Sequence, residues 1–191
     1  TILYGELWGD KLFVNSEGVE IEWHPLVLDL AAIAISMTPN GTPAMGMYRE
    51  GTCQGLEIYD NPETSPEKIG EMAGKYSADQ VNAKSIKSGK YRALIGSLMT
   101  GVLAHESFGH LSEADFVVNH NSPISDKMGE RLGSQHATII DSGVPPYNGA
   151  FYLPFDDQGI PASETVLLEN GILKHFLHNR GTAAYLDQKV T

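Results

Sequence analysis

The sequence predicts an α+β fold made of antiparallel sheets with a few helices. Short segments with partial hydrophobic alternation, separated by turn residues, fill the beginning and the end of the 191-residue chain. One well-marked helix start lies between them, and the dipeptide Asn170-Gly171 is a strong signal for a type I′ hairpin. Because the chain opens on strand-like sequence at Thr1 rather than on a methionine, we expect a fragment of a larger protein.

The first 50 residues predict strands. Three short alternating segments come first, with turn residues 15–18 between the last two, and we expect them to form an antiparallel meander. These segments are residues 2–8, 11–15 and 19–23. The apolar run 27–37 then stops at the turn residues 38–41, and the segment up to Glu50 completes a second predicted hairpin.

A helix over residues 66–83 is predicted from its start. Ser65 is a suitable N-cap, Pro66 suits the first helical position, and Glu67 places negative charge in the first turn.

The polar stretch 84–90, closed by Gly89, predicts a boundary between two structural units. Residues 1–88 are expected to be the end of an N-terminal α+β unit, and residues 89–191 the start of a second domain. In the second domain we expect a strand at 91–95, a helix at 97–110, a polar surface loop at 119–135 that orders only with a ligand or partner, and strands at 137–141, 150–155, 164–168 and 172–177.

The composition disfavours several classes of function. The 13 Lys+Arg against 24 Asp+Glu give a net charge of −11, which disfavours nucleic acid and anionic membrane surfaces as partners. No apolar run reaches the roughly 18 residues of a membrane span, since Asp29 and Ser36 interrupt the run 26–37. The single cysteine, Cys53, cannot form an internal disulfide, and no signal peptide precedes it, so we expect a cytoplasmic protein.

The segment His105-Glu106-x-x-x-His110 predicts a zinc site. Imidazole is a common zinc ligand, and a hydrolytic site needs about three protein ligands, an open position for water and a nearby base. His105 and His110 would be ligands, and Glu106 would be the general base that takes a proton from water.

The spacing of the two histidines needs a structural explanation. On a regular helix, positions i and i+5 point about 140° apart, so the rings would not meet one ion. They converge if the helix widens to a π-turn, or if its last turn opens at Gly109. We therefore predict that the geometry of the site requires glycine at position 109. On spacing alone, a chance arrangement of the seven histidines is the more common explanation.

The surrounding sequence resembles a known family. Residues 101–115, which contain His105, Glu106, Gly109 and His110, resemble the motif region of the TldD branch of the TldD/PmbA family of metallopeptidases. The later segments 141–145, 155–161, 165–174 and 177–183 resemble that family's downstream segments in the expected order.

The resemblance implies a two-part α+β architecture with a central metal site, in which an extended peptide binds as an added strand. It implies Zn²⁺ as the cofactor, a peptide or unfolded polypeptide as the substrate, and either a homodimer or a heterodimer with a TldE/PmbA-like subunit. In that family the third ligand is a cysteine near the C-terminus, whereas Cys53 precedes the motif and is not assigned this role. We therefore expect weak or no zinc binding, and little activity, from this fragment alone.

Other polar residues are weaker candidates. Glu113 and Asp115 could orient a histidine from the second shell of the metal, or could form a solvated acidic helix end. Asp156-Asp157 fits a turn better than a cation site, although the resemblance covers both aspartates. Isolated histidines are usually surface or packing residues, and this is the expected role of His120, His136, His175 and His178.

The leading function is therefore a zinc-dependent peptidase. The alternative is a non-catalytic peptide-binding or partner-subunit module that uses strand addition. A zinc hydrolase acting on non-peptide amides is a third possibility.

Overall fold

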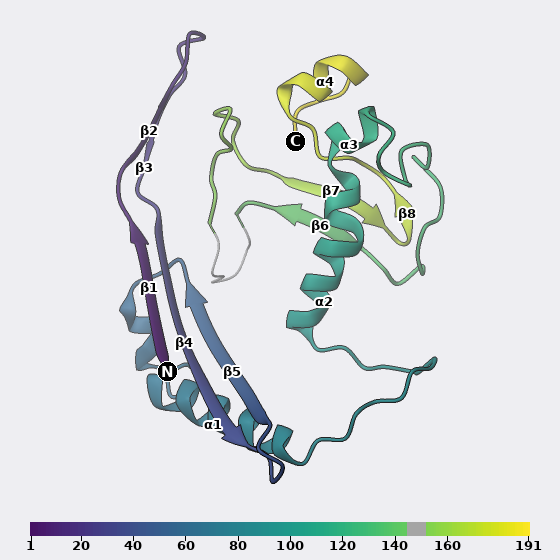
Figure 1. The fold of residues 1–191 in the computed structure, drawn as a ribbon. Coiled ribbons are helices and arrows are strands. Elements are labelled where there is room, and N and C mark those ends of the chain that lie inside the picture. The colour runs from purple at the N-terminus through teal and green to yellow at the C-terminus, as the bar shows by residue number, and fades with distance from the viewer. Residues whose placement is uncertain (145–151) are drawn as a thin grey trace. The chain divides into compact units, whose positions relative to one another are not determined.

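The chain consists of two compact units (Figure 1). Unit 1 contains residues 1–89, and unit 2 contains residues 90–144 and 153–191. The computed structural model describes residues 1–144 and 152–191. Antiparallel sheets with a few helices make up the fold, as the sequence predicts.

Unit 1 is built on a three-stranded antiparallel sheet with the order β1-β4-β5. Its strands are β1 (Ile2–Trp8), β4 (Leu26–Met37) and β5 (Pro43–Thr52). The predicted hairpin of β4 and β5 is confirmed. A separate pair, β2 (Lys11–Val14) and β3 (Glu20–Trp23), follows the turn that the sequence predicts between them.

The predicted meander is wrong in its first pairing, because β1 pairs with β4 and not with β2. Trp8 lies opposite Leu26, and Lys11 lies opposite Trp23. Strands β1 and β2 thus run along one side of a long ribbon, and β3 and β4 return along the other side.

Helix α1 (Pro66–Val81) covers one face of this sheet. It begins as predicted, since the Ser65 hydroxyl accepts a hydrogen bond from the Lys68 N–H at 3.2 Å. Ile69 and Ala73 are buried against strand β4. The helix lies so close to β5 that a Cβ added at Gly46 would be 2.2 Å from the Ala73 carbonyl oxygen. A short 3₁₀ helix, η1 (Leu56–Asp60), precedes α1.

Residues 83–96 contain no helix or strand, so the strand expected at 91–95 is absent. Leu94 and Ile95 are exposed, and no described strand pairs with them. A β-branched and apolar composition does not make a strand without a neighbour that supplies hydrogen bonds.

Unit 2 combines a second three-stranded sheet with a helical segment. The sheet has the order β6-β7-β8 and contains β6 (Ile139–Ser142), β7 (Glu164–Glu169) and β8 (Ile172–Leu173). Asn170 and Gly171 both have positive φ, at 48° and 81°, which confirms the predicted hairpin turn.

The helical segment runs through four consecutive elements. They are α2 (Ser97–Ala104), the π-turn η2 (His105–Gly109), the 3₁₀ turn η3 (His110–Ser112) and α3 (Ala114–Val118). The last helix of the unit, α4 (Arg180–Leu186), follows β8 after a short irregular stretch. The core of unit 2 is formed by Phe108, Ala114, Val117, Ile124, Leu167, Leu168, Leu173 and Phe176.

Several predictions for unit 2 are corrected. The segment 119–135 is irregular, but it is fixed to the core: Ile124 is buried, and the Ser122 hydroxyl donates to the Leu111 carbonyl at 2.7 Å. The strand expected at 172–177 is shortened to the two residues of β8, and Leu177 forms only an isolated bridge with Glu113. For the strand expected at 150–155, residues 150 and 151 lie outside the described residues, and Phe155 forms only an isolated bridge.

Helices α3 and α4 were not predicted, because each is short and depends on tertiary contacts. In α4 a local signal exists, since the Asn179 side chain accepts from the Thr182 N–H as an N-cap. None of the helices in the described residues is long and apolar enough to cross a membrane.

Candidate metal centre

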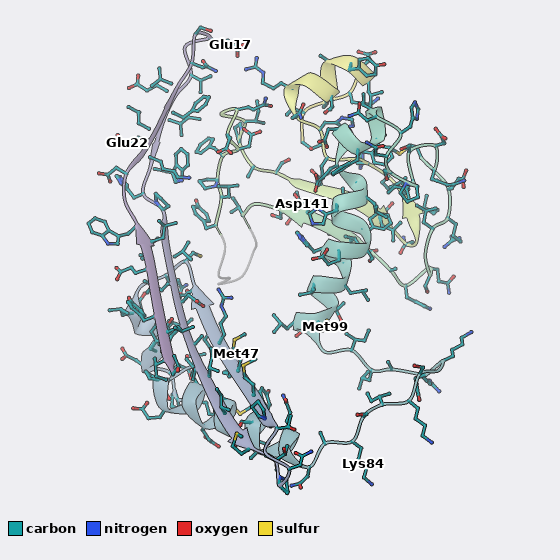
Figure 2. The ribbon with its side chains drawn as sticks, in the orientation of Figure 1. Glu17, Glu22, Met47, Lys84, Met99 and Asp141 are labelled. Atoms are coloured by element: carbon teal, nitrogen blue, oxygen red, sulfur yellow. The ribbon has the colours of Figure 1, made fainter. Side chains whose placement is uncertain are left out.

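The candidate metal centre lies where the helical segment of unit 2 changes its winding. Helix α2 is regular and has no buried residue; Met99, on this helix, is labelled in Figure 2. At His105 the chain enters a π-turn, in which the N–H of His110 bonds to the carbonyl of His105, five residues earlier. Of the two ways predicted for bringing the histidines together, the structure contains the π-turn.

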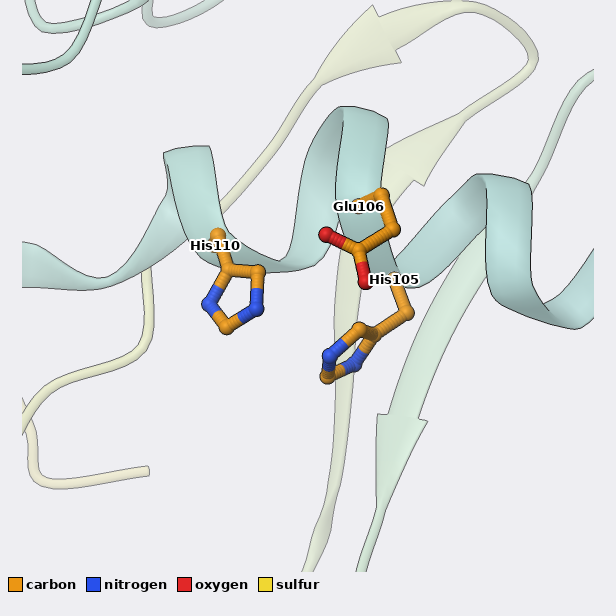
Figure 3. A group of neighbouring side chains, drawn as sticks. All are labelled: His105, Glu106 and His110. Carbon is orange, nitrogen blue, oxygen red and sulfur yellow. The ribbon is translucent and has the colours of Figure 1, made fainter.

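The π-turn places both histidine rings on one side of the helical segment (Figure 3). The ring centroids of His105 and His110 are 4.5 Å apart, with an angle of 69° between the ring planes. One ligand atom from each of His105, Glu106 and His110 lies within 4.8 Å of the others. All three residues are exposed.

Gly109 does not distort the backbone as expected. Its φ and ψ are −55° and −61°, which any residue adopts in a helix. An added Cβ would meet the Ala104 carbonyl oxygen at 3.8 Å and the His105 Nδ1 atom at 4.0 Å, which are ordinary contacts. The widened turn therefore requires no glycine at this position.

Glu113 holds the second histidine. Its Oε1 atom is 2.6 Å from His110 Nδ1. Because an ionised carboxylate only accepts hydrogen bonds, Nδ1 of His110 is the donor. The other ring nitrogen, Nε2, is then the one that can coordinate a metal ion. Asp115 lies in the first turn of α3.

The remaining sequence candidates lie outside this cluster. Cys53 belongs to unit 1 and is partly buried. His175 Nδ1 lies 2.9 Å from the Val166 carbonyl oxygen, while His178 is buried. His120 and His136 are exposed.

Asp156 has the predicted turn role. Its Oδ1 atom accepts hydrogen bonds from the N–H groups of Gln158 and Ile160, at 2.9 Å and 2.8 Å. This carboxylate therefore closes an Asx-type turn, which ends at the positive φ of Gly159.

The donor set of the cluster fits zinc. Two imidazoles supply two ligands of a type that zinc accepts, and a carboxylate lies within 4.8 Å of them. Among the residues that the structure describes, no other group of three such side chains converges in this way.

Comparison with known proteins identifies the family. Residues 88–191 match the model of the PmbA/TldA metallopeptidase C-terminal domain. A metalloprotease from Methanocaldococcus jannaschii is 34% identical over 194 residues, covering 100% of this chain and 41% of the relative. A zinc metalloprotease TldD homolog from Saccharolobus solfataricus is 33% identical over 113 residues, covering 59% of this chain and 25% of the relative.

Solved structures share the fold. A Thermotoga maritima protein, described as a candidate modulator of DNA gyrase, superimposes with a TM-score of 0.79 at 30% identity, covering 100% of this chain and 42% of that protein. TldE from Thermococcus kodakarensis superimposes with a TM-score of 0.76 at 18% identity, covering 98% of this chain and 41% of TldE. The chain thus spans about two fifths of the length of the proteins that match all of it. It belongs to the PmbA/TldD family of metallopeptidases.

Proposed function

We propose that this protein is a zinc-dependent peptidase that hydrolyses peptide bonds. One observation carries the proposal: the π-turn brings the rings of His105 and His110 to 4.5 Å, with the Glu106 carboxylate beside them. A donor set of this kind, exposed to solvent, is suited to hydrolysis rather than to a closed structural site. The metalloprotease relatives support the same assignment.

Each residue has a separate role in the proposed reaction. His105 and His110 would hold the zinc ion, and Glu113 fixes the tautomer and orientation of His110. The chemistry that a bound zinc ion supplies is polarisation of the scissile carbonyl and a lower pKa, about 7, for the attacking water. Glu106 takes the proton from that water and passes it to the leaving amine.

Residues 1–191 alone are proposed to bind zinc weakly and to have little activity. The cluster offers two imidazoles, and Glu106 is needed as the base, so a third ligand must come from outside this group of three. Stoichiometric zinc held by three protein ligands within residues 1–191 would contradict this part of the proposal.

The proposed substrate is a peptide or unfolded polypeptide that binds as an added strand. Strands β1 and β5 are the outer strands of their sheet, and an outer strand has free backbone groups for such pairing. We also propose a cytoplasmic protein that forms a homodimer, or a heterodimer with a TldE/PmbA-like subunit. The shared fold with TldE supports the second arrangement.

The decisive experiment replaces the base and leaves the ligands in place. In the full-length protein loaded with zinc, Glu106→Gln is expected to keep the zinc content and to lower peptide cleavage about 100- to 10,000-fold. Glu130→Gln, an exposed change elsewhere in unit 2, is the matched control and should retain activity.

Two outcomes would contradict the proposal. If peptide cleavage is unchanged in Glu106→Gln, Glu106 is not the general base. Peptide binding without zinc and without cleavage, in the unmutated protein, would instead favour the non-catalytic binding module.

A further inference from the structure

The helical turns that carry both histidines end shortly after His110. Ser112 is the last residue of η3, and Glu113 has extended φ and ψ of −65° and 120°. The last carbonyls of a helix have no partner within the helix, so other groups must supply donors. The Glu113 N–H reaches the His110 carbonyl only at 3.4 Å, which is a long hydrogen bond.

Two donors from distant parts of the chain cap this end. The Ser122 hydroxyl donates to the Leu111 carbonyl at 2.7 Å. The Leu177 N–H donates to the Ser112 carbonyl, also at 2.7 Å. The first of these bonds comes from a side chain, so a simple substitution at Ser122 removes it without changing the backbone.

Ser122 is itself held in position. It lies in the irregular segment 119–135 and is only 6% exposed. Its hydroxyl oxygen accepts from the N–H of Ile124 at 3.4 Å, and Ile124 belongs to the core of unit 2. The hydroxyl is thus connected to the core on one side and to the helical turns on the other.

The stop after Ser112 decides where the Glu113 carboxylate points. Glu113 Oε1 lies 2.6 Å from His110 Nδ1, and the backbone of Glu113 has already left the helix. Without the cap, the Leu111 carbonyl would need another donor, and in a regular helix this is the Asp115 N–H, four residues later. Taking that donor requires helical φ and ψ at Glu113, which would move the carboxylate away from His110.

We propose that Ser122 is a positioning residue for the metal centre. Its hydroxyl ends the helical turns at Ser112 and thereby keeps the Glu113 carboxylate on His110. The inference rests on the proposed zinc site. Removing a group that orients a metal-ligating histidine typically weakens metal binding about 10- to 100-fold, and Ser122 acts one step further away, through Glu113.

The test measures zinc affinity in the full-length protein, by competition with a chromophoric chelator. Ser122→Ala is expected to raise the dissociation constant for zinc about tenfold. Ser125→Ala is the matched control, because the Ser125 hydroxyl donates to the carbonyl of Ser122 at the same distance, 2.7 Å, within the same segment.

The control separates positioning from support of the fold. A hydrogen bond that only supports the fold lowers the free energy of unfolding when it is lost, and leaves the zinc affinity of the folded protein unchanged. We therefore expect both variants to be less stable than the parent, and only Ser122→Ala to bind zinc more weakly.

A double-mutant cycle tests the route through Glu113. Glu113→Ala is expected to weaken zinc binding more than Ser122→Ala does. Adding Ser122→Ala to Glu113→Ala should then have little further effect, because the carboxylate that Ser122 positions is gone. Effects of the two changes that multiply would overturn this route.

Ser122→Cys covers the case in which Ser122→Ala does not fold, because a thiol is a much weaker donor than a hydroxyl. Zinc affinity equal to that of the parent, in Ser122→Ala or in this replacement for it, would overturn the inference. Failure of the peptidase proposal gives a different result, since the parent would then bind zinc without cleaving peptides. A full-length parent that binds no zinc would overturn both.

Discussion

Unit 1 and unit 2 differ in how they use their helices and their buried polar groups. Helix α1 in unit 1 is packed along its length, with Ile69, Ala73 and Ser77 buried. The buried Ser77 hydroxyl lies 2.9 Å from the Ala44 carbonyl oxygen and 2.7 Å from the Ser36 hydroxyl, so it has partners. In unit 2, helix α2 has no buried residue, and one nitrogen of the buried His178 lacks a partner among the residues that the structure describes.

The difference separates a region that follows local packing rules from one that departs from them. Local rules of packing and hydrogen bonding are obeyed where a helix only supports a sheet, and departures from them concentrate where ligands are held. The π-turn and the unpartnered nitrogen of His178 are both in unit 2, which also carries the candidate metal centre.

The largest expected effect tests the tight packing of unit 1. The change Gly46→Ala would place a Cβ 2.2 Å from the Ala73 carbonyl oxygen and 2.3 Å from the Ser77 nitrogen. Strand β5 and helix α1 would have to separate, so we expect a loss of about 3 kcal/mol in the free energy of unfolding, measured in urea.

Gly70→Ala in helix α1 is the control for this change, because nothing lies within 4 Å of a Cβ added at Gly70. It should raise the stability by about 0.5–1 kcal/mol, which is the helix propensity difference. If Gly46→Ala is as stable as the parent, the close packing of α1 on β5 is wrong.

An intermediate effect concerns the buried histidine of unit 2. The pKa of His178 in the folded state is below its ordinary value of 6.5, mainly because of burial. Just below pH 6.5, His178 therefore binds more protons in the unfolded chain than in the folded protein. Its contribution to the free energy of unfolding is present above this pH and is lost as the pH falls.

The change His178→Phe removes this titration. We expect the unfolding free energy of the parent, relative to that of the variant, to decrease between pH 7 and pH 5 by at most about 1.4 kcal/mol per pH unit. His136→Phe, at an exposed position, controls for the loss of a histidine. Parallel stability curves for His178→Phe and the parent would show that His178 is protonated equally in both states.

The smallest expected effect tests whether the candidate metal centre requires glycine at position 109. In Gly109→Ala the new Cβ would lie 3.8 Å from the Ala104 carbonyl oxygen and 4.0 Å from His105 Nδ1. We expect a change in stability between zero and a gain of about 1 kcal/mol, because the backbone is already helical. Gly101→Ala in α2, where nothing lies within 4 Å of the added Cβ, is the control. A loss of more than about 1 kcal/mol at Gly109 alone would restore the requirement for glycine.

The features that the sequence predicted correctly have local causes. Helix α1 was predicted from the cap at Ser65 and the proline after it, and the cap bond is present. The hairpin at Asn170-Gly171 depends on two consecutive residues that tolerate positive φ. The π-turn was one of two predicted ways for ligands five positions apart to meet one ion, the other being an opening of the last turn at Gly109.

The features that were missed depend on distant parts of the chain. Strand β1 pairs with β4 rather than with its neighbour β2, and the alternation within each strand is the same for both pairings. A shallow, open cavity in unit 2 collects Glu113, Asp141 and His178 from segments that are far apart in the sequence. No spacing rule connects these residues, so the cavity could be found only in three dimensions.

The π-turn has a consequence for how a metal ion would be taken up. Phe108, inside the same turn, is buried in the core of unit 2, so the event that folds this core also aligns His105 and His110. An incoming ion would then meet two donors that are already oriented, and little further chain entropy would be lost on coordination. The affinity of such a centre for a metal ion would be linked to folding, because a mutation that loosens Phe108 would weaken metal uptake without changing either histidine.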